Sequence, residues 1–272
     1  MQWQYSLAQL TVLGCAPPEM TYIAARAGYD YVSYRLIYMG LPGEPNYALD
    51  QNKEMYLQTK RAMADTGLKL LDMELARINK GLEPKRYLPA MEIAAELGGK
   101  HVLSSVWVDD WNFAVESFGE LCDLAKPFGL TVDLEYVPIS GLKNLDDTVK
   151  FLKAVNRENA GLMIDTHHFH RAYDKVEALD SLPKEWFNFL HLCDACGEIP
   201  TTLEEMTRIL REERLYVGEG GINVAEIIKH IPQVPCSIEL PNIAKVKELG
   251  YAEHAARCLD SAKSYFLENS LN

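Results

Sequence analysis

The stretch Gly161-Leu162-Met163-Ile164-Asp165-Thr166-His167-His168-Phe169-His170 joins a short apolar run to an acid and three histidines. The apolar residues are typical of a buried β-strand. The polar residues that follow could bind a metal ion or transfer a proton. We therefore expect a strand over residues 160–165 that ends at the opening of a functional site.

Similar apolar runs recur along the chain and alternate with segments of helical periodicity. The predicted strands cover residues 4–10, 29–36, 68–75, 101–106, 130–136, 160–165, 187–192 and 235–240. The predicted helices cover residues 17–27, 49–65, 84–97, 113–128, 145–155, 171–179, 203–212, 224–230 and 251–267. No linker or low-complexity segment interrupts this alternation.

Eight alternating units predict an α/β fold, a (β/α)8 TIM barrel with a single domain over residues 1–272. Such barrels commonly need roughly 250 residues. An open, doubly wound sheet is the alternative. It is disfavoured because no Gly-x-Gly-x-x-Gly motif of a dinucleotide fold follows the first strand.

Composition restricts the classes of partner. The formal net charge of −12 argues against binding to nucleic acid, although it leaves small anionic substrates open. Six cysteines are too few for a disulfide scaffold in a chain of 272 residues, and no apolar run is long enough to span a bilayer. We expect a cytoplasmic protein with reduced thiols and no membrane partner.

Four polar residues stand at the predicted ends of consecutive strands: Glu135, Asp165, His191 and Glu239. In a barrel these ends meet at one mouth. Three carboxylates gathered there would repel one another unless a cation were present. An oxygen-rich set with one nitrogen therefore predicts one divalent metal ion, with Mn²⁺, Mg²⁺, Co²⁺ and Zn²⁺ as the candidates.

Further residues near the strand ends are candidates for substrate binding, namely His168, Arg35, Glu74, Arg77, Trp107 and, in a later loop, Glu219. Arg35 and Arg77 could hold a carboxylate, which would favour a keto-acid substrate. Structural roles remain open for Glu74, as a hydrogen-bonding residue, and for Glu219, as a residue that shapes its loop. His167 and His170 are better explained as packing or surface residues.

Five short motifs carry a family resemblance: Leu-Glu135-Tyr, Ile-Asp165-Thr-His-His168, Leu-His191-Leu-Cys-Asp, Ile-Glu239-Leu and the segment from Val217 to Asn223. Over nearly its whole length the chain resembles the xylose-isomerase-like barrel superfamily of sugar-phosphate isomerases, epimerases and related enzymes. The resemblance implies that the four strand-end residues hold one divalent ion and that His168 reaches substrate. It also implies that Glu135 and Glu239 exchange a proton with a substrate carbon.

The chain lacks residues that are typical of two branches of the family, and this narrows the range of expected activities. The tagatose-epimerase-like branch has a Glu and an Arg where this chain has Gly141 and Gly197, which argues against ketohexose epimerisation. The apurinic endonuclease branch needs additional histidines where this chain has Tyr38 and Arg77. DNA repair is therefore disfavoured.

The resemblance implies a divalent-metal-dependent isomerase or epimerase of a small sugar or keto-polyol, acting by proton transfer next to a metal-bound carbonyl. Two alternatives stay open. One is a metal-dependent lyase resembling 3-dehydroshikimate or inosose dehydratases, and the other is a non-catalytic barrel that serves as a binding subunit. A small sugar or keto acid is the expected substrate, and family members often form homo-oligomers.

Overall fold

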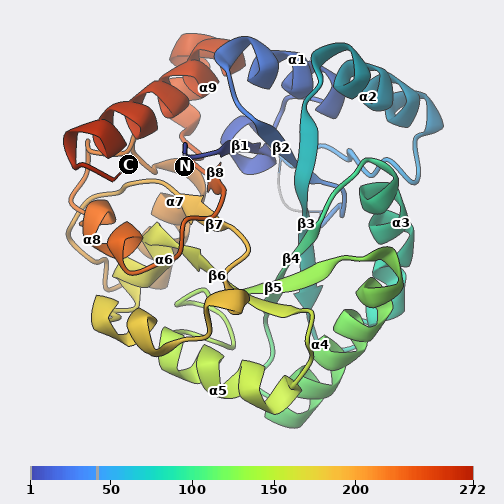
Figure 1. Ribbon diagram of the computed structural model, residues 1–272, viewed down its shortest axis with the longest axis vertical. Helices are drawn as coiled ribbons and strands as arrows, with labels where there is room; N and C mark the ends of the chain where they lie inside the picture. The colour runs from blue at the N-terminus through green and yellow to red at the C-terminus, as the bar shows by residue number, and fades with distance from the viewer. Residues whose placement is uncertain (1, 41–42, 272) are drawn as a thin grey trace.

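Eight parallel strands close into a barrel in which β1 pairs with both β2 and β8 (Figure 1). The computed structural model describes residues 2–40 and 43–271, so residues 1, 41, 42 and 272 lie outside the described chain. The strands are β1 Tyr5–Ala8, β2 Tyr31–Arg35, β3 Lys69–Ile78, β4 His101–Val106, β5 Thr131–Glu135, β6 Ala160–Asp165, β7 Leu190–Leu192 and β8 Cys236–Ile238. The predicted fold class, a (β/α)8 barrel, is confirmed.

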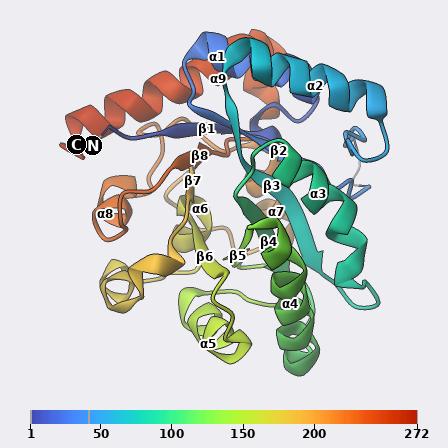
Figure 2. The same cartoon turned by 45° about the vertical axis from the view of Figure 1, so that its right-hand side comes forward.

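Helices form an outer ring around the strands, as two views of the molecule show (Figures 1 and 2). They are α1 Pro17–Ala27, α2 Lys53–Thr66, α3 Leu88–Glu96, α4 Trp111–Ala125, α5 Leu145–Val155, α6 Thr166–Arg171, α7 Leu203–Glu212, α8 Val224–Lys229 and α9 Ile243–Glu268. Of these helices, α7 is labelled well inside the ring in Figure 1. Within the described residues, none of these helices is long and apolar enough to cross a membrane.

Short polar side chains fix where many of these helices begin. Asn52, Asp110 and Asn144 each accept a hydrogen bond from a backbone N–H in the first turn of α2, α4 and α5. Two helices, α1 and α2, end at a glycine in the left-handed conformation. These signals are local, which is why the predicted helix over residues 145–155 matches α5.

One predicted helix, over residues 171–179, is wrong. Helix α6 instead begins directly after β6, because the Asp165 carboxylate accepts a hydrogen bond from the His167 N–H at 2.7 Å and caps the first turn. Tyr173 has a φ of 57°, which ends the helical path. A separate 3₁₀ helix then covers Val176–Ser181.

Several other boundaries also differ from the prediction, for example α2, which begins at Lys53 instead of residue 49, and β7, which begins at Leu190 instead of residue 187. Strand β3 continues to Ile78 and so carries Arg77 within the sheet. Helix α9 begins at Ile243, and Gly250 interrupts it with a φ of 75° and a ψ of 167°. The prediction started this helix after the break because a glycine is a common end signal.

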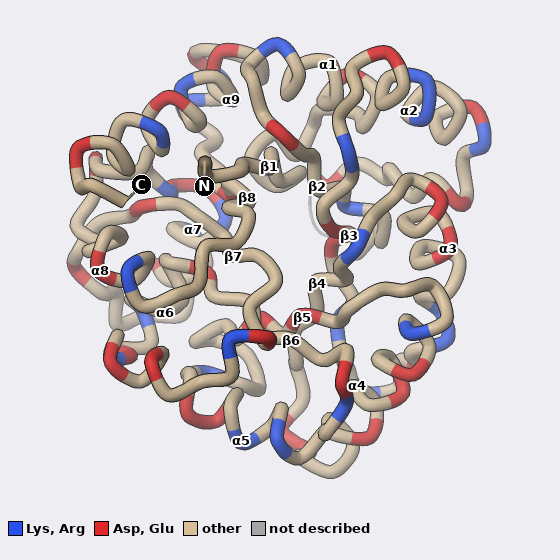
Figure 3. The backbone as a smooth tube through the Cα atoms, viewed as in Figure 1, with Lys and Arg blue, Asp and Glu red and all other residues tan. Residues whose placement is uncertain are grey.

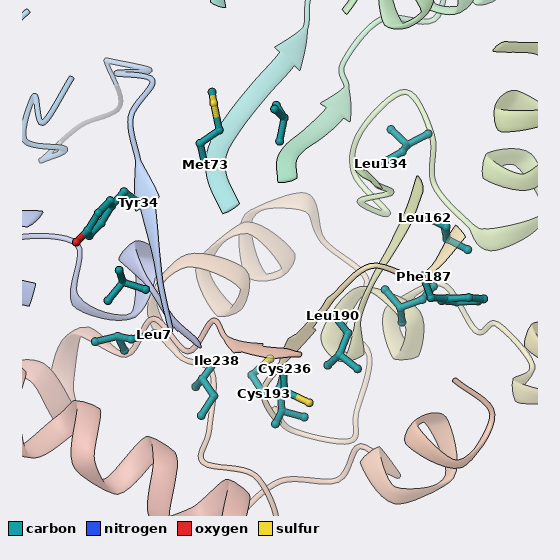
Figure 4. Packing of buried hydrophobic residues seen from close by; sticks show 14 of the residues in the cluster. Leu7, Tyr34, Met73, Leu134, Leu162, Phe187, Leu190, Cys193, Cys236 and Ile238 are labelled. Atoms are coloured by element: carbon teal, nitrogen blue, oxygen red, sulfur yellow. The ribbon is translucent and has the colours of Figure 1, made fainter. Parts of the chain in front are cut away.

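Side chains alternate between the two faces of each strand. Leu134, Leu162 and Leu190 belong to the large cluster that packs the strands against the helices, and Figure 4 shows members of this cluster from around the barrel. The neighbouring positions, such as Asp133 and Phe189, point into the barrel. The barrel axis therefore holds both a small apolar cluster and buried polar groups.

Gly161 permits one of these polar contacts. Asp133 accepts hydrogen bonds from Thr131 at 2.5 Å and from Asn188 at 2.7 Å. A Cβ atom on Gly161 would lie 2.1 Å from the Asp133 carboxylate and 2.7 Å from the Asn188 amide. The first residue of the apolar run on β6 is therefore glycine because the Asp133–Asn188 pair crosses it.

We predict that Gly161→Ala lowers the free energy of unfolding by about 1–3 kcal/mol, because the added methyl group overlaps buried polar atoms. Gly119 in α4 is the matched control, since a Cβ there meets nothing closer than 3.6 Å. Gly119→Ala should stabilise the protein by about 0.5–1 kcal/mol through helix propensity. Urea unfolding measures both, and equal effects of the two substitutions would contradict the packing explanation.

Candidate metal centre

Four strand ends bring Glu135, Asp165, His191 and Glu239 together at one mouth of the barrel. Each residue occupies an inward-facing position, and Asp165 pairs in register with His191 across β6 and β7. One ligand atom from each residue lies within 4.8 Å of the others. All four residues are buried, with 6% or less of their surface exposed.

The atoms of this cluster fit a divalent cation. His191 Nδ1 lies 3.5 Å from Glu135 Oε1 and 3.5 Å from Glu239 Oε2. Among the described residues, Glu135 Oε1 and both ring nitrogens of His191 are buried without a hydrogen-bond partner. Buried polar atoms are normally satisfied, so these atoms are available as ligands, and carboxylate oxygens with one imidazole suit the metals named above.

Arg214 supplies one positive charge to the cluster, although no pattern in the sequence indicated that it lies there. Its side chain is 1% exposed and lies 2.7 Å from Asp165 Oδ2 and 3.0 Å from Glu239 Oε2. Burial alone would raise the pKa of Glu239. The charges of His191 and Arg214 outweigh that effect and hold the pKa well below its usual range.

The position of Arg214 depends on contacts distant in sequence. Isolated bridges between Asp194 and Leu215, and between Glu213 and Asn242, fix the backbone on both sides of it. No arginine stands at Gly197, but a guanidinium does enter the site from the loop after α7. At Gly141, by contrast, a Cβ would lie 2.3 Å from the Val108 carbonyl oxygen, so no side chain fits there.

The three histidines after β6 have different surroundings. His168 Nε2 lies 3.8 Å from Glu135 Oε1 and 3.7 Å from Asp165 Oδ2, beside the cluster. His167 is buried with its Nδ1 at 3.3 Å from His168 Nδ1, and its burial lowers its pKa well below the usual value. The His170 ring contacts the Gly197 carbonyl oxygen at 2.9 Å. Only His168 is close to the four cluster residues.

A cavity of about 290 Å³ opens directly above the cluster. It is close to the lower end of the usual volume of small-molecule sites, about 300–1,000 Å³. The candidate site residues that line it are Glu135, Glu239, His168, Arg35, Arg77 and Trp107. A larger hollow of about 450 Å³ beside α6 and α8 is lined by none of these residues.

Glu74 supports the cavity from behind instead of lining it. Its Oε2 lies 3.3 Å from Arg35, whose other amino group lies 3.7 Å from Glu44. Burial raises the pKa of Glu74 to about 8, even though the charge of Arg35 opposes the shift. The structure thus places Arg35 between two carboxyl groups.

Glu219 belongs to a loop that Asp194 organises. The Asp194 carboxylate accepts hydrogen bonds from the backbone N–H groups of Gly218, Gly220 and Ile222 at 3.0–3.1 Å. The Glu219 side chain lies 2.9 Å from Lys245 and is half exposed. Glu219 is not among the residues that line the cavity, so its contacts match those of a loop-shaping residue.

The raised pKa of Glu74 predicts a pH dependence of stability. Because the folded state binds this proton more tightly than the unfolded chain, stability is lost as pH rises from 4.5 towards about 8. The Glu74→Gln variant has no ionisable group at this position, so its stability lacks this pH dependence. We therefore expect urea unfolding of metal-free protein to show a wild-type stability that falls relative to Glu74→Gln across this window.

Glu158→Gln is the control for this measurement, since that side chain is exposed and loses the same charge. Its stability should follow the wild-type curve in shape. Parallel curves for Glu74→Gln and the wild type would show that Glu74 is ionised in the folded protein at neutral pH.

The amino-acid sequence of the chain is similar to those of several known enzymes. The chain is 26% identical over 144 residues to an inosose isomerase of Bacillus subtilis, an alignment that covers 49% of this chain and 50% of the relative. The chain thus spans about half the length of that enzyme. It is also 25% identical over 233 residues to an L-ribulose 3-epimerase of Methylomonas sp., covering 78% of this chain and 72% of the relative.

A solved structure shares the whole fold. The crystal structure of an IolI protein with a bound zinc atom superposes with a TM-score of 0.80 at 21% identity, covering 98% of this chain and 99% of that one. At this identity the likeness establishes the fold alone. The family described as xylose isomerase-like TIM barrel matches residues 22–262. The chain therefore belongs to the xylose isomerase-like TIM barrel family.

Proposed function

We propose that this protein is a divalent-metal-dependent isomerase or epimerase of a small sugar or keto-polyol. The observation that carries the proposal is the placement of Glu135 and Glu239. Both line the cavity, and each lies 3.5 Å from the same nitrogen of His191. Two carboxylates that face one cavity can move a proton to and from a substrate carbon.

Glu135, Asp165, His191 and Glu239 would hold the metal ion. When bound, a divalent ion at this place polarises a substrate carbonyl and makes the neighbouring C–H more acidic. A carboxylate then suffices as the base, because the proton it must remove is less tightly held. The inosose isomerase and the ribulose epimerase among the relatives support this reaction class.

Glu135 and Glu239 are the proposed acid–base pair. One carboxylate takes the proton from carbon, and a carboxyl group returns a proton to the opposite face of that carbon in an epimerase, or to its neighbour in an isomerase. The charges of His191 and Arg214 lower the pKa of Glu239 and keep its carboxylate ionised at neutral pH. The same shift makes Glu239 a weak base, so proton transfer to it depends on a substrate C–H that is made more acidic, as a bound divalent ion would make it.

His168 is proposed to orient the substrate. It lines the cavity beside the acid–base pair. The imidazole of His168 is directed at the cluster by the helical turn that Asp165 caps. Hydrogen-bond donors held in this way can fix a substrate hydroxyl or carbonyl before proton transfer, which is how positioning lowers a barrier.

Metal binding tests the ligand set. We expect the purified protein to bind one divalent ion, and Asp165→Asn and Glu239→Gln to weaken that binding by more than about a hundredfold, since even indirect partners of metal ligands can cost that much. Glu212→Gln is the control, because Glu212 lines the cavity outside the cluster. Calorimetry with Mn²⁺ and Zn²⁺ makes the measurement, and unchanged affinity in Asp165→Asn would refute the assignment.

Solvent-deuterium exchange tests the reaction. With ketoses and keto acids as substrates, the metal-loaded protein should exchange the hydrogen next to the carbonyl. Glu239→Gln, at saturating metal, should slow exchange by roughly 100- to 10,000-fold, the usual contribution of general acid–base catalysis. Exchange that survives chelation, or that is undiminished in Glu239→Gln, would overturn the mechanism.

The same experiment separates the alternatives by the mass of the product. A dehydratase releases a product lighter by one water, whereas an isomerase or epimerase leaves the mass unchanged apart from incorporated deuterium. A binding subunit exchanges nothing with any compound that it binds.

A further inference from the structure

We infer that the substrate carries an anionic group, a carboxylate or a phosphate, which binds between Arg77 and Arg211 at the mouth of the cavity. This inference rests on the proposed function for the same site and names the class of carbonyl compound that it takes. The inference assigns anion binding to Arg77 and not to Arg35. Arg35 already forms ion pairs with Glu44 and Glu74, whereas Arg77 forms no close ion pair with any described residue.

Arg77 is held in place with its donors free. It lies near the end of β3, in register with Ser105 on β4. Its guanidinium stacks over the Trp107 ring at 4.6 Å from the ring centre, and the Trp107 indole donates to the Ser105 hydroxyl at 2.8 Å. Stacking fixes the plane of the guanidinium and leaves its N–H edge available for a bidentate anion.

Arg211 reaches the same cavity from the other side. It lies in the last turn of α7, the helix that follows β7, and β7 is opposite β3 in the closed barrel. Both arginines line the cavity. The pKa of Arg77 is lowered to about 10 by burial and then by the charges of Arg35 and Arg211, against the opposing charges of Glu135 and Glu44. Arg77 stays protonated at neutral pH.

Arg77 and Arg211 differ from the other two arginines of the cavity because, in the described chain, neither forms a close ion pair with a carboxylate. Arg35 lies between Glu44 and Glu74, and Arg214 lies between Asp165 and Glu239. In residues 2–40 and 43–271, the guanidinium groups of Arg77 and Arg211 form no ion pair within 4.0 Å, although the charges of Glu135 and Glu44 act on Arg77 from farther away. Two unpaired cations at one mouth attract an anion.

The arginines at the mouth of the cavity contrast with the charge of the whole protein. The protein carries a net charge of −12, and acidic and basic residues mix around its outer helices (Figure 3). Arginines without an ion pair at this mouth are a local arrangement rather than a consequence of composition, and they lie in the same cavity as the carboxylates of Glu135, Glu212 and Glu239. Among the described residues, Arg77 Nε is buried without a hydrogen-bond partner, as is Arg35 Nε, so neither nitrogen is used by the surrounding protein.

The proposed anion site and the proposed acid–base pair lie in the same cavity. Arg77 and Arg211 line the same space of about 290 Å³ as Glu135 and Glu239. A small molecule can therefore place its carbonyl at the metal cluster and a terminal anion between the two arginines. Compounds with an anionic group several carbons from the carbonyl fit this arrangement.

Two pairs of compounds test the inference in the exchange assay. The phosphate pair is D-xylulose and D-xylulose 5-phosphate, and the carboxylate pair is L-sorbose and 5-keto-D-gluconate. In each pair the members differ only in the terminal anion. We expect the anionic member of at least one pair to have the lower KM, and Arg77→Gln and Arg211→Gln each to raise that KM about tenfold, the cost of losing one charged hydrogen-bond partner.

Arg208→Gln is the matched control, because Arg208 lies one turn earlier on α7, is exposed and pairs with Glu213 outside the cavity. It should leave KM unchanged. The pair that shows the preference identifies the anion as phosphate or carboxylate. Equal KM values within both pairs, with Arg77→Gln and Arg211→Gln behaving like the wild type, would overturn the inference while the proposed reaction stood.

Binding of inorganic phosphate to metal-free protein provides a readout that does not depend on catalysis. Calorimetry should show binding that weakens about tenfold in Arg77→Gln and in Arg211→Gln but not in Arg208→Gln. If no compound undergoes exchange yet phosphate binding depends on Arg77 and Arg211, the proposed function fails and the anion site stands. Phosphate binding that is absent or equal in all variants, together with equal KM values within the carboxylate pair, would refute the anion site.

Discussion

The burial of three carboxylates at one end of the barrel is the constraint on which the site depends. Glu135, Asp165 and Glu239 lie together with at most 6% of their surface exposed. Carboxylates this close would repel one another or take up protons unless positive charge accompanied them. Arg214 supplies one such charge, and a divalent ion held with His191 would supply the remainder.

The buried carboxyl groups of the barrel fall into two sets, one with raised pKa values and one that stays ionised. Below the mouth, burial raises the pKa of Asp72 to about 6 and that of Asp133 to about 7, so these groups take up protons at a higher pH than ordinary carboxyl groups. At the mouth, the charges of His191 and Arg214 keep Glu239 ionised. The alternation of side chains along each strand places both layers on the axis. The charged layer is the one that the cavity exposes to a substrate.

Local signals explain what the sequence could predict. Strand periodicity and the polar residue at each strand end were enough to foresee that Glu135, Asp165, His191 and Glu239 converge. The helix over residues 171–179 was wrong because the Asp165 cap and the left-handed backbone of Tyr173 lie outside simple periodicity. Arg214 could not be foreseen, since its direction comes from bridges to residues far along the chain.

X-ray absorption at the metal edge identifies the atoms bound to the ion. For protein loaded with Zn²⁺ or Mn²⁺, we expect oxygen ligands with a single imidazole and no sulfur, and loss of the imidazole signal in His191→Ala. Cys193 lies within 3.4 Å of Arg214 and is the nearby thiol that could compete. Sulfur scattering, or an imidazole signal that persists without His191, would refute the four-residue ligand set.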